Sequence, residues 1–197
     1  MRINIFCTNE TIDILNSTCA TQKTALLQSA HFNFLLFLIH RRGDIRVAVV
    51  SYSSKPSTAM NFASPSDKVI KKIGSIKKPG GCGTSLGRAM YMTRRRIVPN
   101  TRTNSNKAMF IISTGLLNMG TSHPKASRLL ESEKSFQIFS IAIGKNPNTR
   151  VLSSVTSQPI KSHLIYLRYY GDVFDAVRRT VTLKKKGEVP GAGKRST

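Results

Sequence analysis

Residues 107–115 read Lys-Ala-Met-Phe-Ile-Ile-Ser-Thr-Gly and decide the fold class. The run is apolar, with a polar residue at its start and a glycine at its end. Such runs are typical of strands buried on both faces, which occur where helices cover both sides of a parallel sheet. Residues 45–52 and 136–144 are two further runs of this kind, with helical patterns between the runs. The alternation predicts an open α/β sheet that binds ligands at the carboxyl ends of its strands.

The other patterns predict the elements around these runs. A short β-branched run at residues 11–15 predicts the first strand, and the strand at residue 107 is expected to lie beside it in the centre of the sheet. Edge strands are expected at residues 59–63 and 165–167. Helices are expected at residues 23–40, from Ser66 or Asp67 to about 73, and at 85–98, 124–134, 149–155 and 172–183. The predicted fold is a three-layer α/β/α domain, doubly wound, with a mostly parallel six-stranded sheet.

The charge of the chain is extreme. Its 197 residues suffice for one domain with a sizeable core, and 40% are hydrophobic, which predicts a folded globule. The net charge is +22, from 31 basic and 9 acidic residues, which indicates attraction to polyanions such as nucleic acid or sulfated glycans. The alternative is a basic surface that is only solvated. The candidate polyanion-binding residues are Lys68, Lys71, Lys72, Lys77, Lys78, Arg94, Arg95 and Arg96.

The ends of the chain differ in composition from its middle. Residues 1–10 are interpreted as a lead, 11–183 as the domain, and 184–197 as a basic disordered tail that contains Lys-Lys-Lys and three glycines. Residues 1–10 lack the apolar core of a signal peptide, and the apolar run at 32–39 is too short to span a membrane. We therefore expect a fragment of a larger protein, or a chain with an incomplete start.

Five motifs occur in the order and with the spacing of one known family. They are Gly-Asp-Ile-Arg-Val-Ala-Val-Val-Ser-Tyr-Ser at 43–53, Gly-Gly-Cys-Gly-Thr-Ser-Leu-Gly-Arg-Ala-Met at 80–90, Phe-Ile-Ile-Ser-Thr-Gly at 110–115, Phe-Ser-Ile-Ala-Ile-Gly at 139–144, and Asp-Val-Phe-Asp-Ala-Val at 172–177. Together they resemble the von Willebrand factor type A domain, over roughly residues 11–183. Each motif alone is weak, and the assignment depends on all of them being in register.

The resemblance implies a divalent-metal site at the top of the sheet. The family builds it from Asp-x-Ser-x-Ser after the first strand, a Thr before the third helix and an Asp after the fourth strand. The corresponding positions here are Asn16, Thr18, Ala20, Thr84 and Thr114. Both carboxylates are replaced, and magnesium sites usually need one or two of them. We therefore predict a degenerate site that binds no metal, and we expect no cofactor.

The resemblance also implies a non-enzymatic function, and no catalytic arrangement of side chains stands out in the sequence. The first hypothesis is an extracellular adhesion module that binds a protein or matrix ligand, with sulfated glycosaminoglycan as a natural partner of its basic clusters. The second is an intracellular nucleic-acid-binding domain, which requires aromatic stacking platforms or a groove-reading helix. The basic clusters carry few aromatic residues, of which Tyr91 is the nearest to Arg94, and this weakens the second hypothesis. Extracellular localisation is the expectation that follows from the first.

The three cysteines allow at most one internal disulfide. In a type A fold the loops that carry Cys19 and Cys82 meet over the metal position, so a disulfide between them could replace the metal as a cross-link. The alternative is two free thiols, which we favour because bridging needs Cα atoms within about 7 Å and correctly aimed side chains. Cys7 is then the odd thiol.

Overall fold

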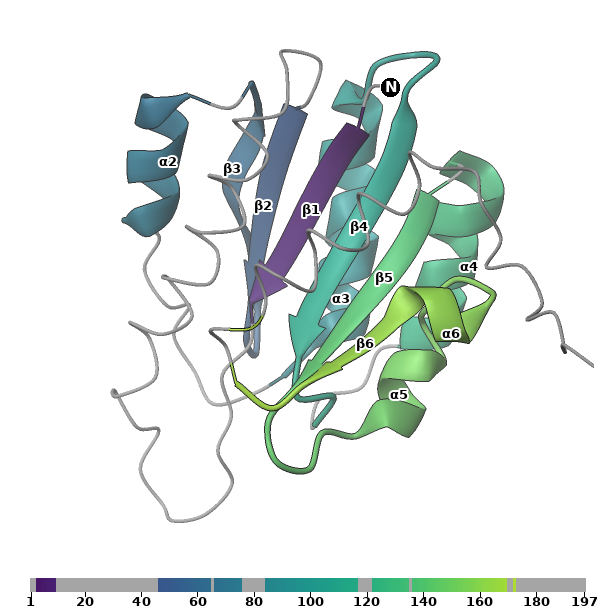
Figure 1. Ribbon diagram of the computed structural model, residues 1–197. Helices are drawn as coiled ribbons and strands as arrows, with labels where there is room; N and C mark the ends of the chain where they lie inside the picture. The colour runs from purple at the N-terminus through teal and green to yellow at the C-terminus, as the bar shows by residue number, and fades with distance from the viewer. Residues whose placement is uncertain are drawn as a thin grey trace, which may run out of the picture.

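The computed structural model describes residues 3–9, 46–64, 66–75, 84–116, 122–134, 136–169 and 172. Its central feature is a six-stranded sheet of order β3-β2-β1-β4-β5-β6 (Figure 1). The strands are β1 (Ile3–Asn9), β2 (Arg46–Tyr52), β3 (Pro56–Ala63), β4 (Asn106–Ser113), β5 (Phe136–Ile143) and β6 (Leu164–Leu167). Strand β3 runs antiparallel to β2, and the other neighbouring strands are parallel. The mostly parallel, doubly wound sheet that the sequence predicts is confirmed.

Strand β4 occupies the centre of the sheet, between β1 and β5, as predicted. Phe110, Ile111 and Ile112 point alternately to the two faces, yet none is more than 2% exposed. The strand is therefore buried on both faces, which explains why its sequence is a continuous apolar run rather than an alternating one. It ends at Ser113, so Thr114 and Gly115 lie just beyond the sheet.

The strand between β2 and β4 is β1 (Ile3–Asn9), so the prediction of a first strand at residues 11–15 is wrong. The last residue of β1, Asn9, lies opposite Ser51 of β2 and Ile112 of β4. A strand in this position must pair with neighbours of seven and eight residues, and a five-residue strand would leave some of their backbone groups unpaired. Residues 11–15 lie outside the described residues, and β1 falls within the segment interpreted as a lead.

The antiparallel edge strand is longer than the predicted 59–63. Strand β3 begins at Pro56, three residues before the predicted start. Proline is tolerated there because it is the first residue of an edge strand. The hydroxyl groups of Ser51 and Ser57 lie 2.9 Å apart across the two strands, and the pairing shifts register around Val49.

The side chains of the strands alternate between two cores, one on each face of the sheet. Ala48, Met109 and Ile138 belong to the core that contains the buried residues of α3 (Leu86–Met92) and α4 (His123–Lys134). The intervening residues Phe110 and Phe139 point to the other face and stack with ring centroids 4.9 Å apart. The presence of apolar, buried residues on both faces is what defines a three-layer domain.

His163 packs as a core residue and is buried. Its ring centroid lies 4.6 Å from that of Phe139, and its Nδ1 lies 3.0 Å from the carbonyl oxygen of Pro159. It ends the short helix α6 (Ile160–His163), which the sequence did not predict.

The predicted helix at residues 85–98 is confirmed and is irregular in its second half. Helix α3 continues as a π-helical turn over Thr93–Ile97 and a 3₁₀ turn over Val98–Asn100. Its apolar residues Leu86, Ala89, Met90 and Ile97 are buried. The three arginines at 94–96 follow one another directly on this π-helical turn, where Arg94 is half-buried and Arg95 and Arg96 are exposed.

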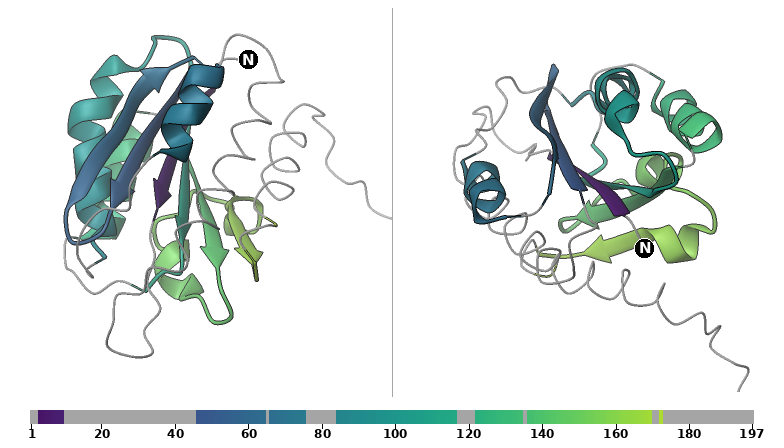
Figure 2. Two further views of the ribbon diagram at one scale, coloured as in Figure 1. Left: turned by 90° about the vertical axis from the view of Figure 1, so that its left-hand side faces the viewer. Right: turned by 90° about the horizontal axis from the view of Figure 1, so that it is seen from above.

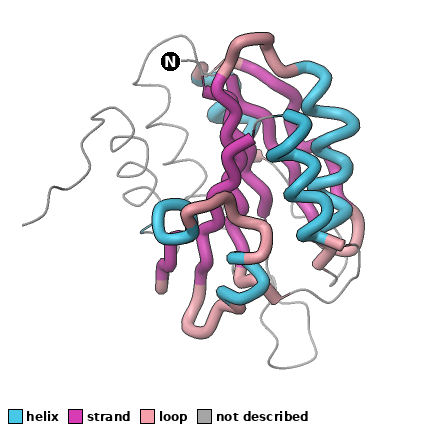
Figure 3. Tube along the Cα trace, turned by 90° about the vertical axis from the view of Figure 1, so that its right-hand side faces the viewer, coloured by secondary structure: helices cyan, strands magenta, loops and turns pink. Residues whose placement is uncertain are grey.

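Helices α2, α4 and α5 lie where the sequence predicts helices. Helix α2 (Asp67–Gly74) is capped by Ser66, whose Oγ accepts a hydrogen bond of 3.4 Å from the backbone N–H of Val69. Helix α5 (Thr149–Ser153) follows β5. Figure 2 shows α2 on one side of the sheet and α3 with α4 on the other, and Figure 3 shows α5 and α6 beside the strands.

Several predicted segments fall outside the described residues. They are the helix at 23–40, the tail at 184–197 and, apart from Asp172, the helix at 172–183. Cys19 and Cys82, the two cysteines of the possible disulfide, also lie outside the described residues. Within the described part of the chain, no helix has both the length and the apolar character needed to cross a membrane.

Candidate functional site

The parallel strands all end at one edge of the sheet, here called the carboxyl edge, where open α/β sheets bind their ligands. Hydroxyl groups follow two of these strand ends. Ser53 comes directly after β2, and Ser113 and Thr114 stand at the end of β4. The Oγ of Ser113 accepts a hydrogen bond of 2.9 Å from the backbone N–H of Gly115, which turns the chain away from the sheet.

The start of α3 is tied to the same edge. The backbone N–H of Ser85 donates to the carbonyl oxygen of Ser53 at 2.9 Å, so the residue before α3 is fixed against the end of β2. Thr84 and Ser85 are both 0% exposed. The Oγ of Ser85 has no hydrogen-bond partner among the described residues, which is unusual for a buried hydroxyl.

The loop after β4 is held by the start of α5. The backbone N–H of Asn148 donates to the carbonyl oxygen of Thr114 at 2.8 Å, and the Asn148 side chain caps α5 by accepting from the N–H of Val151 at 3.2 Å. Gly115 has φ +72°, and a Cβ added there would lie 2.5 Å from the carbonyl oxygen of Asn148. A residue with a side chain does not fit at this position, because both the backbone conformation and the space exclude it.

The structure brings two of the five metal-site positions to this edge. Thr84 is buried before α3, and Thr114 is half-buried after β4. Asn16, Thr18 and Ala20 lie outside the described residues. These three positions were assigned by counting from a strand at residues 11–15, whereas β1 ends at Asn9, seven residues before Asn16.

The described part of the edge does not by itself fit a divalent metal ion. Thr84 and Thr114 offer neutral hydroxyl oxygens, whereas magnesium and calcium sites in proteins rely on carboxylates. Among the described residues, no three His, Cys, Asp or Glu side chains are grouped so that they could hold a metal ion. The nearest acidic residues in sequence to the end of β1 are Glu10 and Asp13, in the segment that follows it.

The two predicted basic clusters lie on opposite sides of the sheet. Lys68, Lys71 and Lys72 are exposed on α2, which borders β3 (Figure 2). The second cluster lies on the π-helical turn after α3, where Arg95 and Arg96 are exposed and Arg94 is half-buried. Lys77 and Lys78 lie outside the described residues. The clusters therefore do not form one continuous basic surface.

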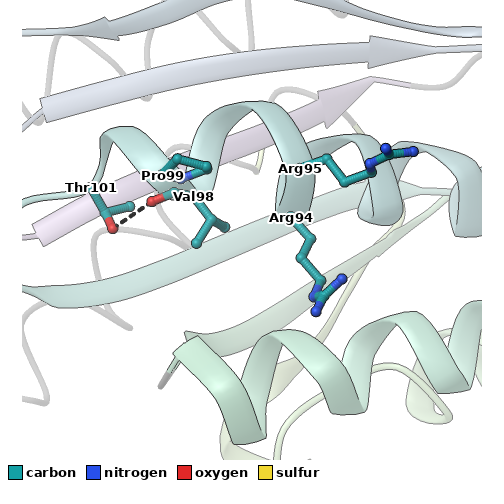
Figure 4. Close-up of a pocket in the computed structure, with 5 residues that line it drawn as sticks. All are labelled: Arg94, Arg95, Val98, Pro99 and Thr101. Carbon is teal, nitrogen blue, oxygen red and sulfur yellow. Dashed lines mark hydrogen bonds between the residues drawn. The ribbon is translucent and has the colours of Figure 1, made fainter.

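The arginine cluster borders a shallow hollow far from the carboxyl edge. The hollow measures about 520 Å³ and is lined by Arg94, Arg95, Val98, Pro99 and Thr101. The 3₁₀ turn Val98–Asn100 lies beside the amino-terminal end of β2, because the Arg46 side chain donates to the carbonyl oxygen of Asn100 at 3.5 Å. In Figure 4 the side chains of Arg94 and Arg95 point in different directions, so they do not converge on one anion.

One group of exposed aromatic side chains was not predicted from the sequence. Tyr166 and Tyr169, at the end of β6, are 52% and 63% exposed, and Arg168 lies between them in the chain. The available signal was the alternation of tyrosine and arginine at the end of a short edge strand. Sequence reasoning searched for lysine and arginine clusters and did not weigh these aromatic residues.

Comparison with known proteins identifies the family. The profile of the von Willebrand factor type A domain matches residues 29–178, and the chain therefore belongs to this family. Type A domains generally serve as protein-interaction and adhesion modules. The chain is 29% identical over 143 residues to the rat and mouse proteins named Sushi, von Willebrand factor type A, EGF and pentraxin domain-containing protein 1. These residues are 68% of this chain and 4% of each relative, so the chain corresponds to a small part of those proteins.

Solved structures share the fold. Proximal thread matrix protein 1 from the mussel byssus matches with a TM-score of 0.75 and 16% identity, over 92% of this chain and 45% of that chain. A structure of the same mussel protein with zinc in its metal-ion-dependent adhesion site matches with a TM-score of 0.75 and 14% identity, over 93% and 47% of the two chains. BatB from Bacteroides thetaiotaomicron matches with a TM-score of 0.70 and 15% identity, over 94% and 100%. At these identities the likeness concerns the fold alone.

Proposed function

We propose that the chain is a non-enzymatic, extracellular type A module that binds a protein or matrix ligand, has lost its metal site and binds sulfated glycosaminoglycan through basic clusters. The observation that carries the proposal is the exposure of Lys68, Lys71, Lys72, Arg95 and Arg96 in a chain of net charge +22. Exposed cations on helices can reach a flexible polyanion without any rearrangement of the fold.

The extracellular part of the proposal is supported by the relatives. One structural neighbour is a matrix protein of the mussel byssus, and the rodent relatives combine a type A domain with Sushi, EGF and pentraxin domains. The ligands of those proteins are not transferred to this chain, because it spans only 4% of the rodent proteins.

The loss of the metal site is supported by the donor set. Thr84 and Thr114 are the two described positions, and neither carries a charge. Two neutral hydroxyl groups do not offset the cost of removing water from a divalent cation. In this proposal, ligand binding does not pass through a bound metal.

The alternative is an intracellular nucleic-acid-binding domain. Single-stranded nucleic acid is bound by basic grooves with aromatic side chains on which the bases stack. Among the described residues, the large apolar side chains that are exposed are Tyr166 and Tyr169, and they lie on β6 and just after it rather than on α2 or α3. The basic clusters therefore offer charge without a stacking platform, which favours the sulfated glycan.

Heparin chromatography tests the proposal. The wild-type chain is expected to be retained and to elute at lower salt after Lys68, Lys71 and Lys72 are all replaced by Gln, because fewer counterions are then released. The triple change Lys125→Gln, Arg128→Gln, Arg150→Gln removes the same charge from other exposed positions and serves as the control. Equal shifts for the two triple variants would show that only net charge matters, and no retention of wild type would reject glycosaminoglycan binding.

A further inference from the structure

The flank of the carboxyl edge at β6 carries an exposed aromatic and cationic group. Tyr166 and Tyr169 are 52% and 63% exposed, whereas large apolar side chains in the middle strands are almost fully buried. Strand β6 pairs with β5 and is the last strand of the sheet among the described residues (Figure 1). We propose that Tyr166, Arg168 and Tyr169, together with Lys145, form a docking surface for an acidic segment of a partner protein.

The ring of Tyr166 is held in place before any partner arrives. Its hydroxyl oxygen lies 3.0 Å from each of the carbonyl oxygens of Gly144 and Lys145, which share its single O–H donor. The loop that carries these carbonyls is fixed to β6, since the N–H of Gly144 donates to the carbonyl oxygen of Leu167 at 3.1 Å. A side chain that is already ordered loses little entropy on binding, so its apolar area contributes to affinity at low cost.

The second tyrosine is paired with a cation. The guanidinium carbon of Arg168 lies 5.7 Å from the ring centre of Tyr169, within the range of a cation–π interaction. Tyrosine and arginine are the residue types that, with tryptophan, dominate binding energy at protein interfaces. The combination of apolar area and charge is typical of protein contacts, whereas polyanion chains bind mainly through charge.

The charge of the stretch that contains the two rings favours an acidic partner. No Asp or Glu occurs between Phe136 and Tyr169. The cations of this stretch are all exposed: Lys145, Arg150, Lys161 and Arg168. One acid, Asp172, is exposed three residues after Tyr169, and its N–H donates to the Tyr169 carbonyl oxygen at 3.3 Å. A surface with this excess of positive charge attracts acidic segments and repels basic ones.

The docking surface is continuous with the edge where the fold binds ligands. The loop from Gly144 to Asn148 connects the two regions, because Tyr166 contacts its first residues and the N–H of Asn148 donates to the carbonyl oxygen of Thr114. The surface is separate from the arginine cluster, which borders the opposite edge of the sheet. The inference rests on the proposed function as a protein-binding module, and it names the surface and the class of partner.

Fluorescence anisotropy on the purified full chain tests the inference with three labelled probes: a random copolymer of glutamate and tyrosine, a heparin oligosaccharide and a single-stranded oligothymidylate. Tyr169→Ala is expected to weaken binding of the copolymer about tenfold, as hot-spot residues do, and to change binding of the other two probes by less than about twofold. Arg168→Gln is expected to weaken copolymer binding more than Lys125→Gln, which removes the same charge from an exposed position on α4.

The outcomes separate the inference from the proposed function. Unchanged copolymer binding by Tyr169→Ala, or equal effects of Arg168→Gln and Lys125→Gln, overturns the docking surface while leaving a basic binding module. An equal loss of heparin or oligothymidylate binding assigns the tyrosines to a polyanion site and also overturns it. If wild type binds none of the three probes, the proposed function fails as well. Both substitutions are at exposed positions, and an unchanged thermal melting curve verifies that each variant is folded.

Discussion

The two halves of the carboxyl edge use their polar groups differently. Around β4 and the start of α3, Ser53, Ser85 and Ser113 are buried, and backbone N–H groups bond to their oxygens: Ser85 N–H donates to the Ser53 carbonyl oxygen and Gly115 N–H to Ser113 Oγ. At the β6 flank, Tyr166 and Tyr169 are more than half exposed. A central strand has neighbours on both sides, whereas an outer strand leaves one side open. The difference indicates that the centre of the edge holds the fold together and that the flank is available to a partner.

The largest expected effect tests how tightly the centre is packed. Gly115→Ala introduces a Cβ at 2.5 Å from the carbonyl oxygen of Asn148 and strains a backbone with φ +72°. We expect a loss of about 3 kcal/mol in the free energy of unfolding, measured by urea denaturation. Gly144→Ala is the control, because Gly144 has φ +123° but open space around an added Cβ. A cost for Gly144→Ala equal to or above that for Gly115→Ala would contradict the close packing of the two loops.

A smaller effect distinguishes two buried hydroxyl groups at the same edge. Ser113→Ala removes the acceptor for the Gly115 N–H and is expected to cost about 1 kcal/mol of stability. Ser85→Ala removes a buried hydroxyl that has no partner among the described residues, so it is expected to be neutral or stabilising by up to about 1 kcal/mol. Thermal denaturation of both variants gives the comparison. If Ser85→Ala is the more damaging change, its hydroxyl has a partner that the described residues do not include.

A still smaller effect tests whether the flank is preordered. Tyr166→Phe keeps the ring and removes the hydroxyl that donates to Gly144 and Lys145, so we expect a loss of about 0.5–1 kcal/mol in stability. Tyr169→Phe serves as the matched control at a more exposed ring. Chemical denaturation measures both, and hydrogen exchange at the amides of residues 144–146 reports whether the loop has loosened. Equal results for the two variants would mean that the Tyr166 hydroxyl does not hold the loop.

The smallest expected effect is that of added metal. Millimolar magnesium or manganese is expected to leave the melting temperature unchanged, because Thr84 and Thr114 provide no charge for a divalent ion. A ligand that binds only the folded state would raise stability by about 2.7 kcal/mol at a hundredfold excess over its dissociation constant. A clear rise that Thr84→Ala abolishes would restore a metal site at the centre of the edge. In that case Glu10→Gln and Asp13→Asn would be the next variants, since both residues follow β1 in sequence.

The sequence predicted the parallel part of the sheet more accurately than its first strand. The runs that became β2, β4 and β5 are buried on both faces, and a strand in that environment can only be apolar along its whole length. Strand β1 was missed because Asn4, Thr8 and Asn9 interrupt its apolar pattern. Its position depends on simultaneous pairing with β2 and β4, which lie far from it in the sequence. Such pairing produces no clear pattern in the sequence of residues 3–9.

The same limit applies to the site. The motifs placed Thr84 and Thr114 at the carboxyl edge, because Thr84 lies just before α3 and Thr114 directly follows β4, and both elements have a clear apolar pattern in the sequence. They did not reveal that Gly115 lies against Asn148, that the two basic clusters are on opposite sides of the sheet, or that Tyr166 is bonded to the loop after β5. Apolar periodicity and net charge are properties of the sequence alone, and they determined the fold class and the attraction to anions. Which polar groups are buried, paired or exposed was decided by contacts between residues far apart in the chain, and these exist only in the folded structure.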